Sequence, residues 1–493
     1  MTFDLDRYRR RAERFSEELS REYYLHLAGH KAELEIEPIY EEHADLFTAE
    51  AVGRLRELAD EPGNGDERDR RRYLLHFAFD GLFGLETRSE TAELAALEAS
   101  LEVDPGDGPI PYRQVRIEQA NEPDAERRAA LEEAQDAILS ERLNPLHRAA
   151  LERAHELCHE FGWPSYAAAY GDLRGVDLEA LCRQTARFLE QSDDAYAPLL
   201  DPQLAGAALP RLGELRRSDL PRFFRAAGLD RLFGAGRLIQ SFTETLTGLG
   251  FELAVQPNVH LDTEPRPTKS PRAFCSTPRV PQEIYLVISP TGGRDDFAAL
   301  FHEGGHTEHY AHTDPGLAFE FRHLGDNSVT ESFAFLLERL VSEPEWLRAR
   351  LGIEDPSPAV AHARAVKLVM LRRYAAKLAY EFELHSERAA LDRMAARYSE
   401  LLGGATRIPW PEASWLADVD GGFYAACYLR AWTVERTWAA ALRERFGERW
   451  FESAEAGAWL GSIWRNGQRL GADELIAETV GGELDFAELA GAF

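Results

Sequence analysis

Residues 295–312 read DDFAALFHEGGHTEHYAH, and this run predicts a buried helix in a largely helical protein. Phe297, Leu300 and Phe301 recur at helical spacing and predict the side of the helix that packs into the core. We expect an aspartate at position 295 or 296 to cap the helix. The glycine pair at 304–305 costs a helix about 1 kcal/mol per residue relative to alanine, so we expect backbone or a ligand to come close there.

The centre of this run, HEGGH at residues 302–306, is an HExxH motif. His302 and His306 lie four residues apart, so on a helix both imidazoles face one side and can reach a single metal ion. Glu303 lies near the same side, where a carboxylate can act as general base on a water molecule. The donor types predict one Zn²⁺ per chain, held by three protein ligands.

The third predicted ligand is Glu331, which follows His306 by 25 residues in the segment DNSVTESFAFLLE, residues 326–338. A competing interpretation is structural: residues 328–331, SVTE, form a capping-box pattern in which Glu331 folds back on the helix start. Glu338 lies two helical turns further on. It is either a hydrogen-bond partner for one of the histidines or a surface charge, and both interpretations stay open.

A second HExxH copy, HELCH at residues 155–159, shows that the motif alone is weak evidence. Glu179 follows its second histidine by 20 residues and would be its third ligand. Arg153 and Glu160 place charges directly beside this copy, whereas the residues before His302 are uncharged and bulky. We therefore prefer the His302 copy and interpret the other as part of a solvated helix.

The rest of the chain is mostly helical in pattern, with a change of character near its middle. We predict helices at residues 5–30, 68–103, 124–161 and 178–191, and a break at the Pro/Gly segment 104–111. Residues 251–289 are strand-like and rich in proline. Within them, Ile284–Ile288 is either a strand that pairs with an extended substrate or buried core. We divide the chain into a helical part, 1–200, and a part carrying the chemistry, 201–493, together forming one clam-like unit.

Composition narrows the possible partners and location. The 493 residues carry a formal net charge of −29, which disfavours nucleic acid and anionic membranes as partners. The N-terminus lacks the apolar segment of a signal peptide, so we expect a cytoplasmic protein. We also expect a monomer. The four cysteines are scattered without a CxxC pair, which predicts free thiols rather than disulfides or a cysteine metal site.

Several motifs together resemble one enzyme family. They are the HEGGH motif with its glutamate at 331, a histidine at 309, Pro344-Glu345, DTEPRPTKSPRAFC at 262–275 and GGFYAACY at 421–428. This set resembles the thimet oligopeptidase and oligoendopeptidase F family of zinc metallopeptidases, over residues from about 255 to the C-terminus. Peptidases related to angiotensin-converting enzyme share much of this layout, with a ligand spacing one residue shorter.

The resemblance implies a mainly α fold: an elongated, two-lobed helical body with a deep cleft and a small β-sheet beside the HExxH helix, a zincin-like core. It implies hydrolysis of short oligopeptides, with Tyr424 and Tyr428 donating hydrogen bonds to the developing oxyanion. This sequence departs from the family where a histidine is expected, at Val419 or Asp420, and where a third tyrosine is expected, at Ala431. The family also has a larger residue than Gly304. Two alternatives therefore stay open: an inactive peptide-binding scaffold, and a zinc amidase acting on a non-peptide substrate.

Overall fold

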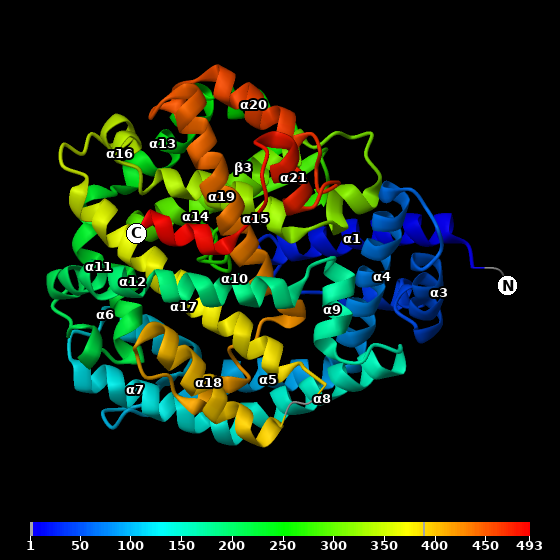
Figure 1. Cartoon of the computed structure of the whole chain (residues 1–493), viewed down its shortest axis with the longest axis horizontal. Helices are drawn as coiled ribbons and strands as arrows, with labels where there is room; N and C mark the ends of the chain where they lie inside the picture. The colour runs from blue at the N-terminus through cyan, green and yellow to red at the C-terminus, as the bar shows by residue number, and fades with distance from the viewer. Residues whose placement is uncertain (1–2, 388–389) are drawn as a thin grey trace. The chain divides into compact units, whose positions relative to one another are not determined.

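The computed structural model describes residues 3–387 and 390–493. Helices make up most of the chain and strands are few, so the prediction of a mainly α protein with a small sheet is confirmed (Figure 1). Among the described residues, no helix is long and apolar enough to cross a membrane.

The chain forms two compact units, each assembled from separate stretches of sequence. The first unit comprises the described parts of Met1–Leu82, Leu229–Val360 and Arg430–Leu484. The second comprises those of Phe83–Gly228, Ala361–Leu429 and Asp485–Phe493. The sequence analysis instead divided the chain once, near residue 200.

The first unit combines helices with a small sheet. Its elements are α1 (Leu5–Leu27), α2 (Glu37–Glu42), α3 (Ala49–Ala59), most of α4 (Gly65–Glu86), α13 (Ala235–Gly248), β3 (Val259–Asp262), β4 (Phe274–Arg279), β5 (Glu283–Val287), α14 (Arg294–His312), α15 (Asn327–Leu340), α16 (Pro344–Leu351), most of α19 (Tyr424–Phe446), α20 (Ala454–Trp464) and α21 (Ala472–Thr479).

The sheet of the first unit has the strand order β3-β5-β4, with β3 parallel and β4 antiparallel to β5. Leu286 of β5 packs into the same core as α14, while Val287 on the opposite face packs against Tyr24 of α1. The central strand is thus paired on both edges and covered on both faces. The interpretation of Ile284–Ile288 as a substrate-pairing strand is therefore wrong, and the buried-core interpretation holds.

The large core of the first unit fixes the two helices that carry the predicted ligands. Phe301 of α14, Phe333 of α15 and Trp438 of α19 are fully buried in one cluster, and the Phe333 and Trp438 rings stack with centroids 4.7 Å apart. Burying such aromatic side chains contributes several kcal/mol and leaves little freedom for the helices to shift.

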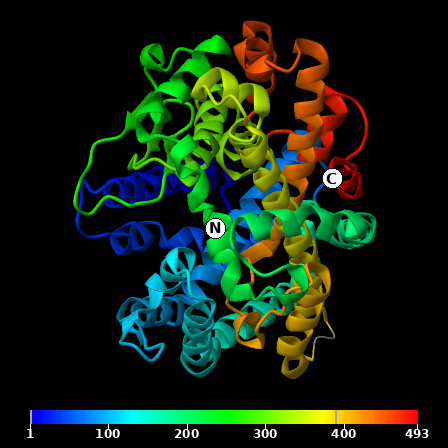
Figure 2. The ribbon, with the colours of Figure 1, turned by 90° about the vertical axis from the view of Figure 1, so that its left-hand side faces the viewer.

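The second unit is almost entirely helical. Its elements are α5 (Arg88–Ser100), β1 (Glu102–Val103), β2 (Ile110–Pro111), α6 (Val115–Asn121), α7 (Ala125–Ile138), α8 (Asn144–Glu160), α9 (Tyr166–Arg174), α10 (Leu178–Gln191), α11 (Asp193–Gly206), α12 (Leu220–Arg225), most of α17 (Ser357–Leu384) and α18 (Leu391–Thr406). Helix α5 packs against α8 in the blue-to-cyan part of the ribbon (Figure 2). A buried ion pair joins α7 to the segment before α12, because Asp219 Oδ1 accepts from Arg128 Nε and Nη2 at 3.0 and 2.6 Å.

Several predicted element boundaries need correction. The single helix expected at 68–103 is two helices, α4 and α5, because Thr87 leaves the helical conformation at φ −109° and ψ 13°. The helix expected at 124–161 is interrupted by a π-helical turn at Leu139–Leu143, and α8 then starts with Pro145 in its first turn, where no N–H is required. The helix at 178–191 is confirmed, and the four cysteines are free thiols as expected.

Candidate metal centre

Helix α14 carries the HExxH motif and starts one residue earlier than predicted. Its N-cap is Gly293, so the expectation of an aspartate cap is wrong. Asp296 instead lies in the first turn and accepts from the backbone N–H groups of Thr291 and Gly292 at 2.6 and 2.8 Å. The predicted buried side is confirmed, since Phe297, Leu300 and Phe301 are fully buried.

Helix α15 carries Glu331 and begins earlier than the capping-box pattern suggests. Asp326 is its N-cap and accepts from the Ser328 N–H at 2.9 Å, so the capping-box interpretation of Glu331 is wrong. Asp326 also accepts from the Ala472 N–H at 3.0 Å and from Arg430 Nη1 at 2.7 Å. Burial raises the pKa of this carboxyl, but Arg430 and the N–H donors outweigh burial and lower the pKa to about 2.

The two glycines of the motif allow α14 to lie unusually close to its neighbours. A β-carbon on Gly305 would lie 2.4 Å from the carbonyl oxygen of Phe333 and 2.6 Å from Cα of Ala334, both in the backbone of α15. A β-carbon on Gly304 would lie 2.3 Å from the ring of Phe242. The departure at Gly304 therefore has a packing reason, because the ring of Phe242 fills the space that a larger residue would need.

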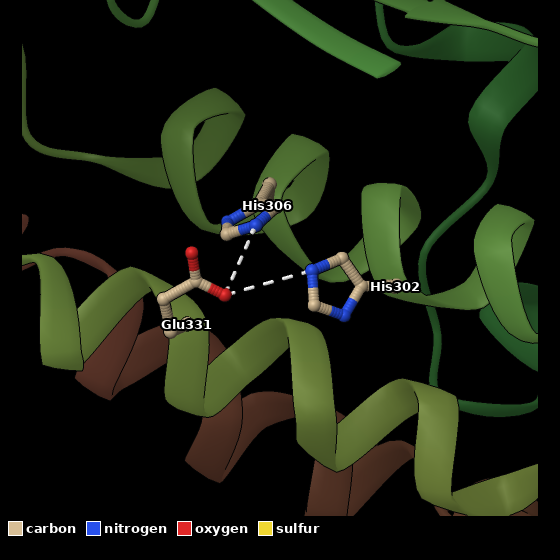
Figure 3. A group of neighbouring side chains, drawn as sticks. All are labelled: His302, His306 and Glu331. Atoms are coloured by element: carbon tan, nitrogen blue, oxygen red, sulfur yellow. Dashed lines mark ion pairs between the residues drawn. The ribbon is translucent and has the colours of Figure 1, made fainter. Parts of the chain in front are cut away.

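Three side chains from these two helices point toward one another (Figure 3). The metal-binding atoms of His302, His306 and Glu331 all lie within 4.8 Å of each other. Glu331 Oε2 lies 3.5 Å from His302 Nε2 and 3.8 Å from His306 Nε2. Tetrahedral ligands of zinc, at bond lengths of ~2.0–2.1 Å, stand roughly 3.4 Å apart. Two imidazoles and one carboxylate at this spacing fit a zinc ion.

The outer nitrogens of both imidazoles are anchored, which directs their inner nitrogens to the common position. His302 Nδ1 donates to Glu338 Oε2 at 2.9 Å, so Glu338 is a histidine partner rather than a plain surface charge. His306 Nδ1 and Thr330 Oγ1 are 2.7 Å apart. A proton on Nδ1 leaves the lone pair of Nε2 facing Glu331, the tautomer that metal ligation requires.

Charges around the three ligands favour a cation. Burial lowers the pKa of His302, but the hydrogen bond and charge of Glu338, with Glu303 and Glu331, outweigh it and raise the pKa to about 9. Burial holds the pKa of His306 well below its usual range, so this ring stays neutral. Burial also raises the pKa of Glu303 to about 7, and its Oε2 accepts from the backbone N–H of Cys275 in β4 at 2.8 Å.

The two predicted tyrosines belong to the second unit. Tyr424 and Tyr428 lie on the first turns of α19 with ring centroids 5.0 Å apart. The Arg174 guanidinium lies over the Tyr424 ring at 5.7 Å, and the Tyr374 ring meets Tyr428 edge-on at 5.6 Å. The metal ligands belong to the first unit, so the role of both tyrosines as oxyanion donors stays a prediction.

The position where the family resemblance expects a histidine is occupied by a charged cluster. The Asp420 N–H donates to Glu381 Oε1 at 2.7 Å, and the Asp420 carboxylate pairs with Lys377 Nζ at 2.8 Å. Ala431, where a third tyrosine is expected, is fully buried and leaves no room for one in this packing.

The second HExxH copy does not form the three-ligand centre that its spacing to Glu179 would allow, in line with the preference for the His302 copy. Within residues 3–387 and 390–493, the side chains of His155, His159 and Glu179 do not come together as a group of metal-binding atoms. His155 is also not solvated, because it is half-buried and its Nε2 lies 2.9 Å from Nδ1 of His385. Burial lowers the pKa of His155 to about 4.

Sequence reasoning missed three groups that support the centre: Thr330, the Cys275 N–H and the ring of Phe242. None carries a local signal, since each acts on a residue at least 24 positions away in sequence. A comparison with protein-family models gives no match for this chain. A comparison with curated proteins gives no significant match either.

Proposed function

We propose that this chain is a zinc-dependent metallopeptidase that hydrolyses short oligopeptides. The observation that carries the proposal is the convergence of His302, His306 and Glu331 on one point, with the outer nitrogen of each imidazole anchored. The motifs that resemble the thimet oligopeptidase and oligoendopeptidase F family support a peptide substrate. The zincin-like core, the two-lobed cleft and the cytoplasmic location belong to the same proposal.

The chemistry follows from the residues of the centre. Bound zinc would supply a Lewis acid that polarises the substrate carbonyl. His302, His306 and Glu331 would hold the ion, and Glu338 and Thr330 keep the two rings oriented.

Glu303, next to His302 on the same helix, is the proposed proton-transfer group. Its carboxylate takes a proton from the attacking water and passes it to the leaving amine. The Cys275 N–H fixes the orientation of this carboxylate through its 2.8 Å hydrogen bond. Tyr424 and Tyr428 are the proposed donors to the oxyanion, on the strength of the resemblance alone.

The peptide in this proposal binds along β4. This strand lies at an edge of the sheet, whereas the central strand β5 is already paired on both sides. Strand β4 is an edge strand of the described sheet and carries the backbone N–H that contacts Glu303. An extended peptide that adds to such an edge gains main-chain hydrogen bonds and lies with its carbonyls at a regular spacing beside the catalytic carboxylate.

The decisive experiment measures zinc content and hydrolysis of a library of short quenched-fluorescence peptides. We expect one zinc per chain, and we expect Glu303→Gln to keep the metal while lowering kcat about 10²–10⁴-fold, the usual contribution of a general base. Glu156→Gln is the matched control, because Glu156 is the middle glutamate of the second HExxH copy and pairs with Arg153 at the surface. It should leave zinc content and rate unchanged.

Other outcomes would favour the alternatives. Zinc binding without cleavage of any peptide would favour the inactive scaffold, or a zinc amidase if a panel of non-peptide amides is cleaved instead. Wild-type protein that takes up no zinc, or that loses none on Glu331→Ala, would exclude the metal centre itself.

A further inference from the structure

The first unit contains a cavity that none of the proposed zinc ligands lines. Its volume is about 330 Å³, which lies within the range of ~300–1,000 Å³ found for small-ligand sites. An engineered cavity of ~150 Å³ already binds benzene, so this cavity has room for an aromatic ring and several further atoms. Its lining comes from α1, α2, α4 and α15, from the residue before α3 and from the segment between α14 and α15.

Aromatic rings form the walls of this cavity. They belong to Phe15, Tyr40, Phe47, Tyr73 and Phe77. The ring centroid of Phe47 lies 4.9 Å from that of Phe15 and 5.3 Å from that of Phe77. Phe47 is buried, and a β-carbon on Gly81 of α4 would overlap its ring, so this wall has a fixed position. Rings at such spacings attract a further ring that packs edge-on or offset against them.

Three polar groups of the lining lack hydrogen-bond partners. The Asn327 amide, the His323 imidazole and the Tyr73 hydroxyl form no hydrogen bond with any side chain or backbone group in the described part of the chain. Burial, together with the nearby charge of Arg322, lowers the pKa of His323 to about 3, so this ring is neutral and offers one N–H and one lone pair. Polar groups without partners in an apolar cavity cost free energy, which a ligand with its own hydroxyl or N–H recovers.

The charge of the lining excludes an anionic ligand. No lysine or arginine is among the described residues that line the cavity. Asp80 contributes a half-exposed carboxylate, which lies 3.2 Å from His76 Nε2. A carboxylate or phosphate on the ligand would therefore meet a like charge and no lysine or arginine. A neutral aromatic group suits these walls better.

The position of Asn327 connects the cavity with the metal centre. Asn327 and Glu331 lie four residues apart on α15, so both face the same side of the helix, about 6 Å apart along its axis. Phe335, one turn further on, continues this side, and its ring centroid lies 5.1 Å from that of His302. About two residues of an extended peptide span the same 6 Å. A substrate side chain in the cavity therefore belongs to a residue close to the bond that is cleaved.

We propose that this cavity is the specificity pocket for an aromatic substrate side chain with a polar tip, tyrosine or tryptophan. The aromatic ring packs against the walls around Phe47, and the hydroxyl or ring N–H donates to the side-chain oxygen of Asn327. The inference rests on the proposed peptidase function, because it names the part of the substrate that is recognised.

The first test measures equilibrium binding of N-acetyl-L-tyrosinamide to the full chain by NMR and needs no hydrolysis. Leu324→Trp adds bulk to the lining and should weaken binding at least ~10-fold. Asn327→Ala adds no bulk and should weaken binding roughly 3–10-fold, the value of one hydrogen bond, without changing the binding of N-acetyl-L-phenylalaninamide. Asn466→Ala is the matched control and should change nothing, because Asn466 lies in the first unit but does not line the cavity.

The second test uses the quenched-fluorescence peptide library. Wild type should prefer tyrosine or tryptophan over alanine at one position by at least ~10-fold in kcat/KM, and Leu324→Trp should lose this preference. Absence of tyrosinamide binding, or equal binding by wild type and both variants, overturns the proposal, as does an equal preference in wild type and Leu324→Trp. Tyrosinamide binding by a chain that cleaves no peptide instead refutes the proposed function and leaves the cavity as an aromatic-binding site, so the two failures are distinguishable.

Discussion

The substitution Gly305→Ala tests whether close packing of α14 on α15 builds the metal centre. The added β-carbon would lie 2.4 Å from the Phe333 carbonyl oxygen, whereas ordinary contact begins at 3.4 Å. The two helices must therefore separate by about 1 Å, because the obstacle is backbone and cannot rotate away. Glu331 lies on the helix that is displaced, two residues before Phe333.

The size of the effect follows from two opposing terms. Overpacking of a core costs about 1–3 kcal/mol, and the better helix propensity of alanine returns about 1 kcal/mol, so we expect a net loss of about 0–2 kcal/mol. Metal–ligand distances tolerate only ~0.2 Å, so a shift of about 1 Å should remove Glu331 from the ligand set and weaken zinc binding at least ~100-fold.

Urea unfolding and a zinc titration against a competing chelator measure the two quantities. Gly53→Ala is the control, since a β-carbon there meets no atom within 4 Å in the interior of α3. It should stabilise the protein by about 0.5–1 kcal/mol and leave zinc affinity unchanged. Equal zinc affinity and equal urea midpoints for Gly305→Ala and wild type would refute the reasoning.

Three further predictions follow from the structure. Glu338→Gln removes the charge behind His302 and should weaken zinc binding about 10-fold in the same chelator competition, with Glu345→Gln as an unaffected control. Asp326 has a pKa of about 2 against an ordinary 3.8, so it contributes about 2 kcal/mol above pH ~4 that is lost as the pH falls through ~2. Urea midpoints should show this loss in wild type and not in Asp326→Asn, and parallel pH profiles would contradict it. Asp219→Ala leaves Arg128 buried without its carboxylate and should cost about 3–5 kcal/mol in urea unfolding, whereas Glu179→Ala, at an exposed pair, should leave the midpoint unchanged.

The local sequence pattern was sufficient to predict a buried helix face where the spacing of apolar residues matches the packing in the structure. The buried side of α14 follows from three apolar residues at helical spacing, and their burial is complete. The start of α15 was harder, because aspartate and serine are both good N-caps and the sequence contains one of each, two residues apart. Asp326 takes the cap with support from Arg430 and the Ala472 N–H, which come from distant segments.

Other features depend on tertiary contacts that no local pattern contains. The end of α4 at Thr87 falls inside a helical sequence pattern that contains no proline, and the nearest glycine, Gly84, lies within the helix itself. The contact between His155 and His385 spans 230 residues. The HExxH motif contains His155 but not His385. The second copy was therefore interpreted as part of a solvated helix.

All three proposed zinc ligands come from α14 and α15, within one continuous stretch of the first unit. A ligand that binds only the folded state stabilises it by RT ln(1 + [L]/Kd), which is about 2.7 kcal/mol at 100 times Kd. In calorimetry, zinc should therefore raise the unfolding temperature in proportion to the logarithm of its free concentration, and Glu331→Ala, which removes one ligand from α15, should abolish that increase.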